Sequence, residues 1–344
     1  MCADVPLLKQ IQCAVRESRR KKTPDAAGGQ CTRYQNDPID TPISLKMWAA
    51  RNALPATYEE LRNKTLYAIP MDENKHPGVT AVAVTMKPQI GWIGQLRHNA
   101  HKFVIHMDGK WKLHKGEWLL ITAGVHSTEF MEDRKEMVHS FRPLVYLFTK
   151  NHETAECTVY LLEAFKLLAK QFYGFVPQPG AGCADHGQGL MTGFKFVFPS
   201  VPMLGCWPHV AWHLSHGLLL PLDHPLYDEV SDQIHEMHTC HSLLMFKAMK
   251  SVLKSLWGDT DPLLEKLWRS LFDSDRENWA VCHGQNVPQA LPSNQEMESW
   301  HAKGIMKVLS NQLNQQLGYV LRESLVRVAA LDGNNSIIFL DSLR

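Results

Sequence analysis

The hydrophobic pattern of the chain changes near residue 100. From there, short apolar runs that end in turn residues predict strands, and longer stretches with apolar residues at helical spacing predict helices. In chain order we predict strands at Phe103–Gly109, Trp118–Val125 and Pro143–Thr149, a helix at Glu153–Tyr173, a strand at Gly182–Asp185, a helix at Gln188–Phe196 and a strand at Val201–Cys206. The first three strands are close enough for an antiparallel meander, whereas the last two need crossovers through helices. The pattern therefore predicts an α/β fold with a mixed sheet and helices on its faces.

The flanking segments have a different character. Residues 1 to about 40 contain linker-like residues and the basic run Arg19–Lys22, for which a solvated tail is the favoured interpretation over nuclear import or phosphate contact. Helical spacing then predicts short helices at Ile43–Arg51 and Tyr58–Asn63. Two such helices could form a DNA-binding helix-turn-helix, but the pattern is common, so we favour an ordinary packed helix pair. Residues from about Trp212 to Asn286 read as all-helical, followed by a helix at Met297–Leu321 and a short strand at Ser336–Leu340. We thus divide the chain into an N-terminal region (1–99), a core (100–215), a helical insertion (216–291) and a return to the core (292–344).

Composition narrows the class of protein. With 344 residues, 44% of them hydrophobic, the chain can bury a large core. A net charge of +1 gives no global signal for nucleic acid, so any such contact must come from local patches. The longest apolar stretch, near Gly217–Leu222, is too short to cross a bilayer, and Met1–Gln12 lacks the features of a secretory signal. Eight scattered cysteines do not suggest a disulfide scaffold, which favours a reducing compartment.

Three acids stand at the ends of predicted elements. Asp108 ends the first strand, Asp185 ends the fourth, and Glu298 lies in the first turn of the late helix. Carboxylates from different elements can hold a pair of Mg²⁺ ions, which is the arrangement that cuts phosphodiesters by in-line attack. Acids at such positions also serve solubility and helix capping, so their positions alone do not identify a site.

Four segments around these acids resemble the catalytic domain of Mutator-like element (MULE) transposases. They are similar to the family's Asp-Gly-Thr-Tyr-Lys motif, its second-acid motif, its Phe-Pro…Cys-x-x-His block and its Thr-Asn-Asn-x-x-Glu-x-x-Asn/His motif. In the same order, the four segments are His106–Leu113, Cys183–His186, Phe198–Val210 and Pro292–His301. The resemblance spans about residues 100 to 320 and implies an RNase H-like core with an all-helical insertion before the last catalytic helix.

The resemblance also implies the site. Asp108, Asp185 and Glu298 would be the catalytic metal ligands, and Glu296 remains a rival to Glu298 because spacing alone does not separate them. Lys110 stands where the family usually has Thr, and it either contacts a phosphate or marks loss of the site. Supporting roles fall to three further residues: Cys206, His209 and His301. The pair formed by the first two is half a zinc site, and only His186 or His213 could complete it in space, so packing and hydrogen bonding are favoured over zinc.

The histidine cluster His235, His238 and His241 could bind a metal on a helix, but a polar helix side is favoured. The tryptophans of this part of the chain are expected in the core: Trp257, Trp268, Trp279 and Trp300. Trp207 and Trp300, which adjoin the site motifs, are the two candidates for contact with a flipped base or strand end.

The resemblance implies a transposase that uses Mg²⁺ or Mn²⁺, rather than zinc, to cut DNA at transposon ends and join it to target DNA. Its partners would be DNA and a second copy of the chain, with no membrane, and its location would be the nucleus. Two alternatives stay open. The first is a domesticated or degenerate copy that binds DNA or proteins without catalysis, and the second is an RNase H-like nuclease with another substrate.

Overall fold

The structure, a computed structural model of the full chain, describes most residues between 39 and 301 and three beyond. The described residues are 39, 41–63, 65–69, 79–110, 118–131, 135–150, 153–185, 187–257, 261–287, 290, 292–301, 317, 320 and 321. The predicted lead-in with its basic run, most of the late helix beyond residue 301 and the strand at Ser336–Leu340 lie outside these residues.

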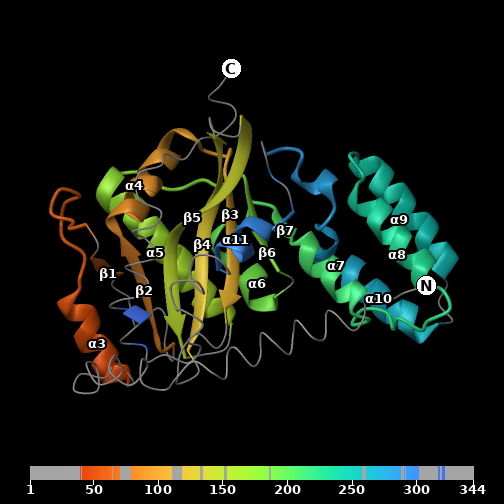
Figure 1. Cartoon of the computed structure of the whole chain (residues 1–344), viewed down its shortest axis with the longest axis horizontal. Coiled ribbons are helices and arrows are strands. Elements are labelled where there is room, and N and C mark those ends of the chain that lie inside the picture. The colour runs from red at the N-terminus through yellow and green to blue at the C-terminus, as the bar shows by residue number, and fades with distance from the viewer. Residues whose placement is uncertain are drawn as a thin grey trace.

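A seven-stranded mixed sheet forms the centre of the molecule (Figure 1). Its spatial order is β1-β2-β5-β4-β3-β6-β7. All neighbours pair antiparallel as far as β3, and β3, β6 and β7 are parallel to one another. The strands are β1 (Leu66–Ile69), β2 (Ala81–Met86), β3 (Val104–Lys110), β4 (Leu119–Met131), β5 (Glu136–Thr149), β6 (Ala181–Ala184) and β7 (Met203–Gly205). The predicted meander and the two crossover strands are therefore confirmed.

Alternation along the strands divides the core between the two faces of the sheet. Where β4 begins, Leu119 and Ile121 join one buried cluster, and Trp118 and Leu120 join another. The first cluster lies under α4 (Lys87–Gln95), α5 (Ala155–Tyr173) and α6 (Gln188–Val197). The second lies under α3 (Pro42–Arg51). The α/β class with helices on both faces is thus confirmed.

The structure adds to the prediction in one region and corrects it in another. Between residues 64 and 99, where the sequence analysis assigned no strand, β1 and β2 extend the sheet across the predicted boundary at residue 100. The predicted helix at Tyr58–Asn63 is wrong, because these residues form bends and turns. Glu60 accepts hydrogen bonds from the amides of Ala56 and Thr57, so its carboxylate closes a turn instead of capping a helix. Without a second helix, no helix-turn-helix forms here.

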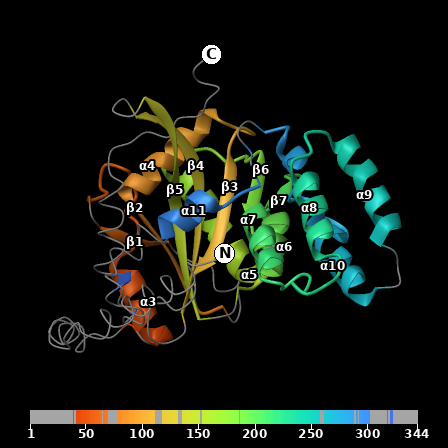
Figure 2. The ribbon, with the colours of Figure 1, turned by 45° about the vertical axis from the view of Figure 1, so that its right-hand side comes forward.

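A helical region follows β7 and lies beside that edge of the sheet (Figures 1 and 2). Its helices are α7 (Trp207–Ser215), α8 (Tyr227–His238), α9 (Leu243–Trp257) and α10 (Pro262–Phe272), followed by the short 3₁₀ segments η2 (Ser274–Glu277) and η3 (Val281–Gly284). These elements share an aromatic-rich core of their own, which contains Trp257, Trp268 and Trp279 as predicted. Among the described residues, no helix combines the length and the hydropathy needed to cross a bilayer.

The histidine cluster and Trp207 belong to the packing of this region. The Trp207 ring stacks on His238 at 4.0 Å and on Trp279 at 5.5 Å. His235 and His238 each place Nδ1 within 3.0 Å of a backbone carbonyl oxygen, and neither joins a group of possible metal ligands among the described residues. The predicted polar helix side therefore holds for the exposed His235, whereas His238 packs against Trp207 and His241 lies beyond the end of α8. Trp207 is engaged in the aromatic stack, and the side chain of Trp300 lies outside the described atoms.

Candidate metal centre

Parallel pairing of β3 with β6 brings two of the predicted acids to one edge of the sheet. The register places Met107 opposite Ala184, so Asp108 and Asp185 are the next residues on adjacent strands. β6 ends at Ala184 while β3 continues to Lys110 beside β4, so both acids lie at the edge of the sheet where β6 stops. Asp108 remains buried, with 8% of its surface exposed. The structure thus brings together side chains that are remote in the chain.

His209 links this pair to the third predicted acid. One ligand atom each from Asp108, Asp185 and His209 lies within 4.8 Å of the others, and the same holds for Cys206, His209 and Glu298. The Nδ1 atom of His209 is 3.5 Å from Oε1 of Glu298. His209 follows from the local fold, since it lies in the first turn of α7, directly after the short strand β7. All three predicted acids therefore lie around one histidine.

The rival acid Glu296 lies elsewhere. Its carboxylate is 3.5 Å from Nε2 of His126 on β4, and the His126 ring stacks on His106 at 3.5 Å. Both acids belong to α11 (Gln295–Trp300), a short helix that contacts β5. The geometry consequently favours Glu298 over Glu296 as the acid associated with Asp108 and Asp185.

A fourth carboxylate, Glu153, completes the acidic cluster and was missed by the sequence analysis. The Glu153 carboxylate lies against Gly109 and Gly187, which are the residues next to Asp108 and near Asp185. A Cβ atom added at Gly187 would be 2.5 Å from a Glu153 carboxylate oxygen, and one added at Gly109 would also meet this carboxylate. Burial raises the pKa of Glu153 to about 7, and the charges of Asp185 and Asp108 add to the increase. Glu153 directly precedes Thr154, the N-cap of α5, so in the sequence it resembles an ordinary acid at a helix start.

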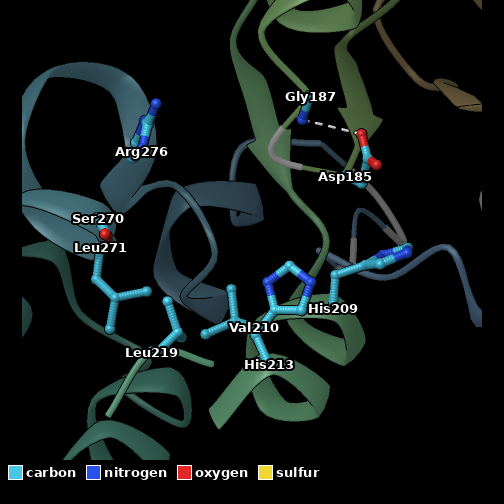
Figure 3. A pocket seen from close by; sticks show the side chains of 9 residues that line it. All are labelled: Asp185, Gly187, His209, Val210, His213, Leu219, Ser270, Leu271 and Arg276. Atoms are coloured by element: carbon cyan, nitrogen blue, oxygen red, sulfur yellow. Dashed lines mark hydrogen bonds between the residues drawn. The ribbon is translucent and has the colours of Figure 1, made fainter. Parts of the chain in front are cut away.

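The ionised form of Asp185 is disfavoured by its surroundings. Burial raises the pKa of its carboxyl, and the Asp108 charge acts in the same direction. The Gly187 amide donates a hydrogen bond to Asp185 Oδ1 at 3.0 Å, which opposes the increase (Figure 3). Like charges gathered in a partly buried cluster are costly without a cation to share them.

His301, one of the predicted supporting residues, holds Asp108 in place. Its Nδ1 atom is 3.2 Å from Asp108 Oδ2, and its Nε2 atom is 3.1 Å from Thr122 Oγ1. Because Asp108 and Thr122 are register partners on β3 and β4, the His301 ring spans two neighbouring strands. His301 is itself buried, which fixes the ring and therefore the orientation of the Asp108 carboxylate.

Asn294 anchors the segment that carries Glu298 and His301. Its Nδ2 donates to the Met107 carbonyl at 2.9 Å, and its Oδ1 lies 2.9 Å from Nδ1 of His106. Its backbone amide donates to Cys206 Sγ at 3.2 Å. Asn294 is fully buried, so these bonds form away from water. Burial also lowers the pKa of His106 to about 4, which keeps its ring neutral at physiological pH.

The third supporting residue, Cys206, accepts a hydrogen bond from the Asn294 amide and also belongs, with His209 and Glu298, to a group that could hold a metal ion. Burial raises the pKa of its thiol to about 12, so the apo side chain stays protonated while it accepts the Asn294 bond. His213 approaches the same cluster, since its charge influences Asp185, whereas Lys110 ends β3 with an exposed side chain.

The donor set fits a divalent cation. His209 Nδ1 and Glu298 Oε1 are inaccessible to solvent and form no hydrogen bond with any described residue. Buried ligand atoms without hydrogen bonds, next to several carboxylates and the Cys206 thiol, form groups that could hold a metal ion. Compared with models of known families and with curated proteins, the chain gives no match.

Proposed function

We propose that the chain is the catalytic domain of a MULE-type transposase, which cuts DNA at transposon ends and transfers the 3′ end to target DNA. The observation that carries the proposal is the grouping of Asp108, Asp185 and His209 within 4.8 Å, with Glu298 3.5 Å from the same histidine. The family resemblance predicted these three acids before any geometry was known. Such a substrate is chromosomal, so we place the protein in the nucleus.

The strand order supports the proposal. Strands β3, β4 and β5 form the antiparallel meander, and β6 and β7 lie parallel to β3 on its other side. This is the arrangement expected of an RNase H-like core in which α5 and α6 make the crossovers. On this assignment, α8 to α10 form the helical insertion between the second acid and the third.

In the proposed reaction, Asp108, Asp185 and Glu298 would hold Mg²⁺ or Mn²⁺. Bound ions of this kind activate the attacking water or 3′-hydroxyl and stabilise the leaving oxygen. His301 orients the Asp108 carboxylate, and the Gly187 amide orients that of Asp185. Glu153 lies beside both aspartates, and a bound cation would favour its ionised form over the protonated form that its raised pKa allows near neutral pH. No covalent bond between protein and DNA is required.

The test is DNA cleavage by the purified full chain with Mg²⁺ or Mn²⁺, using supercoiled plasmid because the terminal repeats are unidentified. We expect Asp108→Asn, Asp185→Asn and Glu298→Gln each to reduce nicking by more than about 100-fold, beyond the ~10–100-fold typical of partners that only orient a ligand. Glu296→Gln is the matched control on the same helix, and we expect it to retain activity. Equal losses for Glu296→Gln and Glu298→Gln would contradict the assignment of the third acid.

Strand transfer separates the alternatives. A labelled duplex with a free 3′-hydroxyl is incubated with plasmid, and joined product is scored. Cleavage without joining would indicate an RNase H-like nuclease instead of a transposase. If the wild-type chain neither cleaves nor joins with either metal, the chain is a non-catalytic DNA-binding or interaction protein and the proposal is wrong.

A further inference from the structure

A pocket of about 340 Å³ opens between the acidic cluster and the helical region (Figure 3). One side is formed by the end of β6 and by α7, and the other by α10 and η2. Asp185 and Arg276 lie on opposite sides of it in Figure 3. The lining residues are Asp185, Gly187, His209, Val210, His213, Leu219, Ser270, Leu271 and Arg276.

Arg276 supplies an uncommitted positive charge. Two nearby cations form ion pairs within the chain: Lys250 pairs with Glu277, and Arg269 pairs with Glu265. Within the described part of the chain, the Arg276 side chain forms neither an ion pair nor a hydrogen bond, although it is partly buried. A guanidinium without an internal partner presents a planar set of donors suited to phosphate.

The remaining lining suits a base and excludes a duplex. Val210, Leu219 and Leu271 offer apolar contact, and the His213 ring offers an aromatic face. The volume lies at the lower end of the ~300–1,000 Å³ typical of small-molecule sites, so a single nucleotide unit fits and a paired helix does not. An unpaired base can stack on an aromatic or apolar side chain without regard to sequence.

We propose that this pocket receives one unpaired nucleotide of the DNA strand, next to the phosphodiester held at the acidic cluster, with Arg276 contacting the phosphate of that nucleotide. The inference rests on the proposed function, because it places a DNA strand at Asp185 and His209. The carboxylates and Arg276 lie on opposite sides of the pocket (Figure 3), so their charges favour one orientation of the DNA strand across the site. The carboxylate side repels an anion unless a cation is bound there, whereas the Arg276 side attracts it at all times.

The experiment measures binding, without cleavage, by fluorescence anisotropy of the full chain in Ca²⁺. The probes are a blunt duplex and the same duplex with one unpaired nucleotide at its end. We expect the wild type to prefer the unpaired end. Arg276→Ala should lose about tenfold affinity for it and show a salt slope smaller by about 0.7–1, corresponding to one lost phosphate contact.

Three further arms identify the pocket. Arg269→Ala, which removes the exposed arginine that directly precedes Ser270 on α10 and pairs with Glu265, should bind both probes like the wild type. Ser270→Tyr, which fills the pocket from a partly buried position, should remove the preference for the unpaired end and keep blunt-duplex binding. A methylphosphonate at the unpaired nucleotide should weaken wild-type binding and leave Arg276→Ala unaffected, a comparison that needs no unfolding control.

The outcomes separate the pocket from the catalytic proposal. If Arg276→Ala matches Arg269→Ala in affinity and salt slope, or if Ser270→Tyr keeps the preference, the pocket assignment is wrong even for a chain that cleaves DNA. If Arg276-dependent binding is found in a chain that never cleaves, the pocket stands and the catalytic proposal fails. Equal binding of an RNA strand would overturn the assignment to DNA.

Discussion

Replacement of Asn294 by alanine tests whether the segment carrying Glu298 is held by buried polar bonds. The substitution leaves two partners unsatisfied, the carbonyl of Met107 and Nδ1 of His106, each 2.9 Å from the amide group that is lost. Met107 and His106 are 0% and 3% exposed, so water cannot replace those bonds without a rearrangement. An unsatisfied buried polar group costs about 1–3 kcal/mol, and two such groups give about 2–6 kcal/mol.

The assay is urea denaturation followed by tryptophan fluorescence, with Gln295→Ala as the matched control. Gln295 is the exposed neighbour of Asn294 in the chain, and we expect its replacement to change the free energy of unfolding by less than about 0.5 kcal/mol. An Asn294→Ala loss below about 1 kcal/mol at an unchanged m-value would refute the reasoning. Plasmid nicking by the folded fraction should fall as well, because Asn294 positions the helix that carries Glu298.

Three other predictions concern packing, pH and metal binding. Gly193→Ala should destabilise the protein by about 1–3 kcal/mol despite alanine's higher helix propensity, because the new Cβ would lie 2.5 Å from Thr158 Cβ between α5 and α6. Thermal unfolding measures this loss, with Thr192→Ala as the exposed control. Burial lowers the pKa of His283, so the unfolded chain takes up its proton first as the pH falls below 6.5 and stability declines. His283→Gln should make that decline between pH 7 and 5 shallower in urea denaturation. Glu153→Gln should raise the Mn²⁺ concentration needed for half-maximal nicking while leaving DNA binding in Ca²⁺ intact, and an unchanged metal requirement would count against a role for this carboxylate.

Most of the core could be predicted because its signals are local. The apolar runs of β3, β6 and β7 and the helical spacing of α5 and α6 each lie within a few residues, and all were predicted near their observed bounds. β4 extends to Met131 and β5 begins at Glu136, whereas the prediction ended at Val125 and began at Pro143. The prediction missed these outer parts because they are rich in polar residues and lack the apolar runs used to find strands. The sequence placed Asp108 and Asp185 at strand ends and the family resemblance selected them, whereas the parallel pairing of β3 with β6 that sets them side by side is seen only in the structure.

The remainder of the site depends on tertiary contacts that no local pattern specifies. Glu298 and Glu296 are two residues apart, so spacing does not separate them; the resemblance favours Glu298, and packing against His209 and His126 shows where each carboxylate lies. Glu153 reaches the cluster because α5 begins where β3 and β6 end. Arg276 faces the site across a space created by the helical region, so its relation to Asp185 was invisible in the sequence.

The bonds from Asn294 have a consequence for biogenesis. Met107 precedes Asn294 by 187 residues, so at about 5–20 residues per second the ribosome needs roughly 10–40 s to deliver the partner of that carbonyl. Until then the nascent sheet lacks the segment that covers His106 and Asp108. Because Glu298 is delivered with the same segment, a growing chain carries at most an incomplete set of the proposed ligands until that segment has been made.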